Sequence, residues 1–143
     1  MTDAGDRSAA FADWLVRQAV VGLIGGGVLV LVLVFVASTG VDDHPLPGCL
    51  LLIATLGALA TLALSVLLRF DAALFHSMAG KDETAAGAEI DQLLTAMRLK
   101  PPPAETRPLD ARMAGARNLV EKQRIAHAVA GVATAGAAAL LWL

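Results

Sequence analysis

Three long apolar blocks that contain no Asp, Glu, Lys or Arg most constrain how this chain can fold. They cover residues 18–38, 49–68 and 125–143, which are 21, 20 and 19 residues long. A helix rises about 1.5 Å per residue, so about 20 residues cross the roughly 30 Å hydrocarbon core of a bilayer. The blocks therefore predict an all-α integral membrane protein with three transmembrane helices.

The composition agrees with a membrane class. Hydrophobic residues make up 57% of the 143 residues and charged residues only 17%, against about 45–50% and about 25% in soluble domains. The net charge of −2 offers no basic surface for nucleic acid. The third block is mostly Ala and Gly, so its residues favour insertion less strongly than the Leu and Val of the first two.

The basic residues predict an orientation. The connector 39–48 has no Lys or Arg, whereas the insert 69–124 holds nine of the eleven basic residues. Arg17, Arg69 and Arg124 stand at span boundaries that share one side if the chain crosses three times. The positive-inside rule then places the amphipathic lead-in 1–17 and the insert in the cytoplasm, and the connector and the C-terminus outside. Arg outnumbers Lys eight to three, which suggests a GC-rich bacterium and hence the cytoplasmic (inner) membrane.

The cytoplasmic insert is predicted to hold two helices around Pro101–Pro103, because consecutive prolines end a helix and form a stiff spacer. The first helix is expected over residues 84–99. It has an apolar stripe with helical spacing that one helix cannot bury alone, so the stripe is expected to rest on the bilayer, on the second helix or on a partner. The stripe residues are Ile90, Leu93, Leu94 and Met97. The second helix, over residues 109–124, is expected to continue into the third span.

Small residues recur four positions apart within the spans. Small residues let membrane helices approach closely, so these pairs are predicted helix-packing sites, within the chain or between copies. The pairs are Gly22 with Gly26, Gly57 with Thr61, and Gly131 with Ala135.

No arrangement of residues points to catalysis, a cofactor or a metal. The spans contain no carboxylate, Lys or Arg that would mark a proton or ion path. His76 and His127 are the only candidate pair for haem, and each is interpreted as a polar residue near a helix end. Asp42, Asp43 and His44 are adjacent, which disfavours convergence on one metal ion, so they are interpreted as a solvated turn.

These features predict a non-enzymatic membrane protein that acts by association, as an accessory or assembly subunit of a membrane complex. Its expected partners are the bilayer and either another protein or a second copy, bound through small-residue helix faces. Two alternatives remain open at this stage. One is a homo-oligomeric pore or permeabiliser of the lysis or toxin type, although the spans show little polar lining. The other is a passive transporter subunit, for which three helices are too few to enclose a cavity without oligomerisation.

Overall fold

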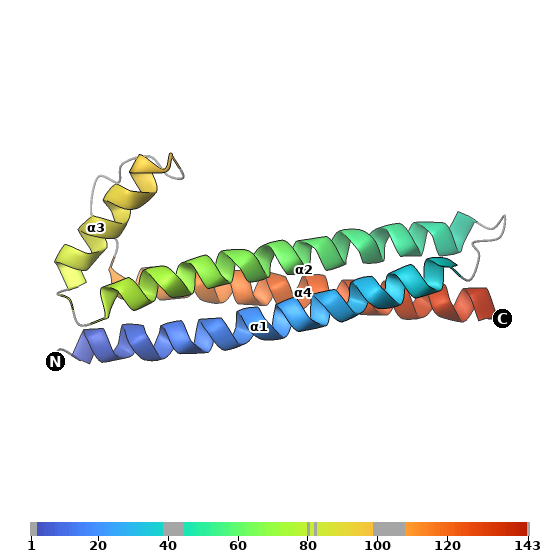
Figure 1. The fold of residues 1–143 in the computed structure, drawn as a ribbon, viewed down its shortest axis with the longest axis horizontal. Coiled ribbons are helices and arrows are strands. Elements are labelled where there is room, and N and C mark those ends of the chain that lie inside the picture. Colours follow the sequence, from blue (N-terminus) through green and yellow to red (C-terminus); the bar gives the residue numbers. More distant parts are fainter. Residues whose placement is uncertain (1–2, 39–44, 80, 82, 99–107, 143) are drawn as a thin grey trace. The chain divides into compact units, whose positions relative to one another are not determined.

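The computed structural model confirms an all-helical chain in the residues that it describes. The described residues are 3–38, 45–79, 81, 83–98 and 108–142. They form four helices (Figure 1): α1 (Asp3–Ser38), α2 (Pro45–Met78), α3 (Glu83–Ala96) and α4 (Leu109–Trp142). Among them, α1, α2 and α4 are long and apolar enough to cross a membrane. Asp42–His44, with most of the predicted connector, and Pro101–Pro103 lie outside the described residues.

The helices divide into two compact units. The head unit comprises residues 1–17 and 68–118, and the span unit comprises residues 18–67 and 119–143. Helices α1, α2 and α4 contribute residues to both units, whereas α3 belongs to the head unit. Each long helix therefore extends beyond the apolar block that the sequence marks as a span.

Contacts within the span unit set the directions of its three helices. Gly22 of α1 faces Ser65 of α2 and Gln123 of α4, while Gly57 of α2 faces Ala130 of α4. Residue numbers therefore rise together along α1 and α4 and fall along α2. Since α1 and α4 run parallel and α2 runs antiparallel to both, the span unit has the connectivity of three successive crossings (Figure 1).

The inner seam of the span unit is built from small side chains. Fully buried positions include Ala54, Ala58 and Ala130, and the seam continues through Ala133 to Leu33. Apart from Leu33 and Val36 of α1, which are buried, many large apolar side chains of α1 and α2 point outward; for example, Val21 is 66% exposed and Leu52 is 61% exposed. Small residues inside and large ones outside are typical of helices packed in lipid, where the surrounding solvent is itself apolar.

The head unit has a core of larger side chains. The Phe11 ring meets the Phe75 ring edge to face, with centroids 5.0 Å apart, and stacks on Trp14 at 5.4 Å. The guanidinium of Arg117 lies 5.6 Å from the centre of the Phe11 ring. Offset and edge-to-face aromatic pairs add stabilisation beyond the apolar area that they bury. Other buried core residues of this unit are Leu15, Leu68, Met78, Ile90, Leu94, Leu109 and Met113.

Helix α3 ends earlier than the residue range 84–99 predicted. The helix stops at Ala96, and Arg98 has a left-handed φ of 56°. The Arg98 N–H donates to the carbonyl of Thr95 at 2.9 Å. A residue in the left-handed region cannot continue a right-handed helix, so local backbone geometry ends α3 before the prolines are reached.

Candidate functional site

The span unit places four of the six predicted packing residues between helices. A Cβ on Gly26 would lie 2.9 Å from Leu62 Cδ2, and one on Gly57 would lie 2.9 Å from Ala130 Cβ and 3.0 Å from the Ala126 carbonyl oxygen. These separations are shorter than ordinary carbon contacts of about 3.5–4.0 Å. At Gly57 two of the close atoms are backbone, so the observed approach requires glycine, whereas at Gly26 the Leu62 side chain can move aside. Gly22 also faces two helices, and Thr61 is fully buried.

The remaining predicted pair, Gly131 and Ala135, lies away from the seam. A Cβ on Gly131 would have no described atom within 4 Å, and Ala135 is exposed. In the described part of the third apolar block, the buried positions of α4 are Ala130, Ala133, Thr134 and Ala137. At about 100° per residue, Gly131 and Ala135 project away from the centre of this buried side.

A chain of hydrogen bonds follows the buried seam. Gln123 Nε2 of α4 donates to Ser65 Oγ of α2 at 2.7 Å, and Ser65 Oγ donates to the Thr61 carbonyl oxygen at 2.7 Å. Thr61 Oγ1 donates in turn to the Gly57 carbonyl oxygen at 2.9 Å. Gln123, Ser65 and Thr61 are all buried, at 4%, 0% and 0% exposed. Because an apolar solvent cannot satisfy such groups, the Gln123–Ser65 bond links α4 to α2 specifically.

A pocket of about 190 Å³ adjoins this polar seam. It is bounded by α1, α4 and Thr61 of α2, and Arg124 is the only ionised residue in its lining. Arg124 donates to Gln18 Oε1 at 3.1 Å. His127 also lines the pocket, and its buried Nδ1 has no hydrogen-bond partner among the described residues. A buried polar atom of this kind normally has a partner.

Two glycines of α1 make the room for the polar residues of α4. A Cβ on Gly22 would collide with the Gln123 side-chain amide. A Cβ on Gly25 would lie 2.6 Å from His127 Cε1. Gln123 and His127 are four residues apart and therefore project from one side of α4. The glycines thus let α1 lie against a polar strip rather than an apolar one.

Only half of the predicted apolar stripe on α3 is buried in the structure. Ile90 and Leu94 are buried, at 3% and 7% exposed, whereas Leu93 and Met97 are each 46% exposed. The sequence left open whether the stripe would rest on the bilayer, on the second helix or on a partner. Half of it is buried within the protein, and Leu93 and Met97 remain accessible.

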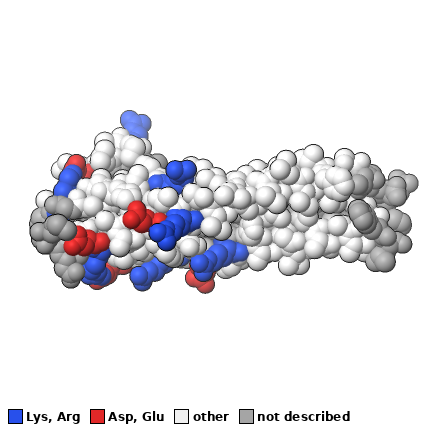
Figure 2. Space-filling view, turned by 60° about the horizontal axis from the view of Figure 1, so that its bottom comes forward, with Lys and Arg blue, Asp and Glu red and all other residues white. Residues whose placement is uncertain are grey.

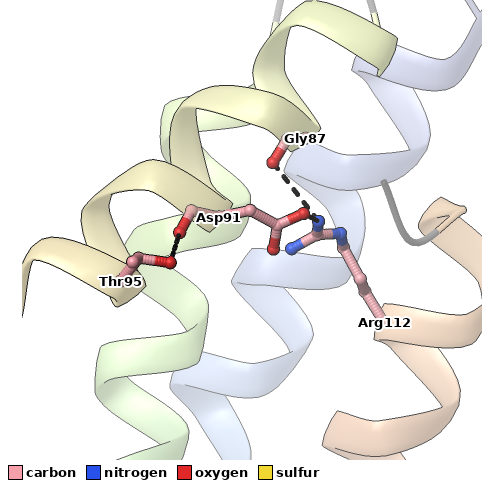
Figure 3. A network of polar contacts seen from close by, with 4 residues as sticks. All are labelled: Gly87, Asp91, Thr95 and Arg112. Carbon is pink, nitrogen blue, oxygen red and sulfur yellow. Dashed lines mark hydrogen bonds and ion pairs between the residues drawn. The ribbon is translucent and has the colours of Figure 1, made fainter. Parts of the chain in front are cut away.

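An ion pair within the head unit joins α3 to α4. The Arg112 guanidinium donates to Asp91 Oδ2 at 2.7 Å and to the Gly87 carbonyl oxygen at 3.3 Å, while Thr95 Oγ1 donates to the Asp91 carbonyl oxygen at 2.8 Å (Figure 3). The Arg112 and Asp91 side chains are only 12% and 11% exposed. Removal of either partner would leave the other charge largely buried, so loss of one partner is expected to weaken the contact of α3 with α4.

Sequence reasoning missed the polar strip on α4. It assigned Gln123 to the cytoplasmic insert and interpreted His127 as a polar residue near a helix end. The four-residue spacing of these two residues, together with the glycines of α1, was the available signal. His76, the other histidine considered, lies in the head unit with Nε2 3.4 Å from Asp13 Oδ1.

Within the described residues, no group of three or more His, Cys, Asp or Glu side chains is placed to hold a metal ion. Comparison of the chain with protein-family models, with curated proteins and with solved structures finds no match.

Proposed function

We propose that this chain is a small non-enzymatic protein of a bacterial inner membrane that acts by association, as an accessory or assembly subunit of a membrane complex. The observation that supports this most is the two-sided character of α4. Its buried side is built from Ala130, Ala133 and Ala137, and its outward surface also carries small residues, with Gly131 open and Ala135 exposed on either side, in the sequence, of Val132, which is 75% exposed.

The outward faces of α1 and α2 carry large side chains, whereas that of α4 mixes the small residues Gly131 and Ala135 with the exposed Ile125 and Val132. Helix α1 exposes Leu31 and Phe35 at 72% and 61%, and α2 exposes Leu56 at 59%. Large flexible side chains suit contact with lipid, whereas small ones allow a second helix to approach closely. The open face of α4, defined by Gly131 and Ala135, is therefore proposed to receive a transmembrane helix of a partner protein.

We further propose that the head unit lies in the cytoplasm and the C-terminus lies outside. Charged side chains gather over one part of the surface, and a long stretch of the same face carries none (Figure 2). Arg17, Arg69 and Arg124 mark the boundary between the charged and apolar segments in the sequence. The parallel α1 and α4 support an odd number of crossings. Reporter fusions at Met1 and Leu143 test this orientation, because both fusions reporting from one compartment would refute it.

The association is tested by purifying the tagged full chain from its native membranes in mild detergent. Gly131→Leu would fill the open face of α4 and is expected to remove a membrane protein that co-purifies in fixed stoichiometry. Gly27→Leu is the matched control, because a Cβ on Gly27 also has no described atom within 4 Å but lies on α1. The control should retain the partner.

Two results would count against the proposal. A wild-type chain that purifies without a stoichiometric partner would refute a subunit role, and a homo-oligomer alone would favour the pore alternative. Equal partner recovery from Gly131→Leu and wild type would refute the assigned face.

A further inference from the structure

The pocket of the span unit combines polar donors with an apolar opening. Its volume of about 190 Å³ is below the roughly 300–1,000 Å³ of pockets that enclose drug-sized ligands. The pocket therefore fits a small polar group rather than an entire metabolite. Val21 and Ala128 line it and are themselves exposed, so it opens on the outer surface between α1 and α4.

The polar side of the pocket favours an anion. Arg124 supplies the only formal charge in the lining, and a guanidinium has five N–H donors. One of these donors is directed to Gln18 Oε1. His127 adds a buried Nδ1 that lacks a partner among the described residues. A phosphate group accepts several hydrogen bonds at once and pairs well with a guanidinium.

The surroundings of the opening favour a phosphate that carries acyl chains. The neighbouring outward residues are apolar, with Val21 and Ile24 each 66% exposed and Val129 47% exposed. Arg124 directly precedes the third apolar block, at the level where the headgroups of a bilayer would lie. Basic pockets between transmembrane helices at this depth are suited to lipid headgroups.

We propose that the pocket lined by Gly22, Arg124 and His127 binds the phosphate group of an anionic phospholipid. Arg124 pairs with the phosphate and His127 lies beside it, while the acyl chains follow the apolar outer faces of α1 and α4. Gly22 and Gly25 are required because side chains at these positions would occupy the space taken by Gln123 and His127. Ala128 of the lining lies three residues before Gly131 on the same side of α4, so the pocket adjoins the open face of that helix. Binding of the phosphate does not require the protein partner.

Native mass spectrometry of the delipidated full chain in detergent tests the proposal with three probes. Phosphatidylglycerol supplies the phosphate and chains, diacylglycerol with the same chains lacks the phosphate, and inorganic phosphate lacks the chains. Phosphatidylglycerol is expected to bind, diacylglycerol to bind at least roughly tenfold more weakly, and excess inorganic phosphate to leave the lipid bound.

Two matched pairs of variants locate the site. Arg124→Gln is expected to weaken phosphatidylglycerol binding by roughly tenfold, whereas Lys122→Gln removes an equal charge from an exposed residue outside the lining and should have no effect. Gly25→Ala should displace the imidazole and weaken binding, while Gly27→Ala meets no described atom and should not.

Three outcomes would overturn the proposal. Equal binding of diacylglycerol would show that the phosphate is not recognised. Equal losses in Arg124→Gln and Lys122→Gln would show general attraction rather than a site. Displacement of the lipid by inorganic phosphate would show that the pocket binds the free phosphate ion and not a phospholipid. Thermal unfolding establishes whether each variant is folded. If Gly25→Ala does not fold, Arg124→Gln still tests whether the pocket binds the phosphate, because Arg124 is exposed and its replacement should not disturb packing.

Discussion

The close approach of α2 to α4 at Gly57 leads to a quantitative prediction. In Gly57→Ala the new Cβ would lie 2.9 Å from Ala130 Cβ, 3.0 Å from the Ala126 carbonyl oxygen and 3.2 Å from the Ala130 nitrogen. Two of these atoms are backbone, so no side-chain rotation relieves the collision. The helices must separate by about 0.5–1 Å to restore ordinary contact distances, which forfeits about a quarter to a half of the dispersion well for the atoms along the gap.

Overpacking of this kind costs about 1–3 kcal/mol, while alanine gains about 0.8–1 kcal/mol over glycine from helix propensity. Gly27→Ala is the matched control, since its Cβ meets no described atom within 4 Å and only the propensity gain applies. The free energy of unfolding of Gly57→Ala should therefore fall about 1–3 kcal/mol below that of Gly27→Ala.

The assay is unfolding of both purified variants in mixed detergent micelles titrated with dodecyl sulfate, followed by circular dichroism. The comparison between the two variants cancels the propensity term that they share. If Gly57→Ala is as stable as Gly27→Ala, the close contact of α2 with α4 is wrong, and so is the role of Gly57 as a packing residue.

Three further predictions concern the head unit and the alternative function. Arg112→Leu leaves the Asp91 carboxylate buried without the guanidinium, which lowers the free energy of unfolding by about 3–5 kcal/mol in fully buried pairs and by somewhat less here. Amide hydrogen exchange should therefore accelerate in α3. Adding Asp91→Leu to this variant should restore the protection. Phe11→Ala removes the contacts with Phe75 and Trp14 and should destabilise the protein by about 3–5 kcal/mol; an unchanged thermal unfolding temperature would contradict this. Liposomes carrying the purified chain are expected to retain a trapped dye, and leakage that grows with protein loading would favour the pore alternative.

The apolar stripe of α3 shows what the spacing of hydrophobic residues can and cannot predict. The spacing of Ile90, Leu93, Leu94 and Met97 identified a helix with one apolar side. It could not show which residues of that side become buried, because burial depends on where the neighbouring helices lie. The structure buries Ile90 and Leu94 and leaves Leu93 and Met97 accessible. The Arg112–Asp91 pair joins residues 21 apart in the chain, a distance at which local pattern carries no information.

In the span unit, too, the sequence does not show which of the predicted packing residues lie between helices. A small residue can face a neighbouring helix or lipid, and the sequence alone does not distinguish the two. The structure places Gly57 against Ala130 and leaves Gly131 open.

The amino-acid sequence by itself determined that this chain forms long apolar helices able to cross a bilayer, since length and hydropathy along one helix are local properties. The tertiary structure alone decided that Gln123 meets Ser65, that His127 lies against Gly25 and that a pocket forms beside Arg124. These are contacts between segments far apart in the chain. They depend on how the helices are rotated and aligned against one another, which composition and periodicity do not specify.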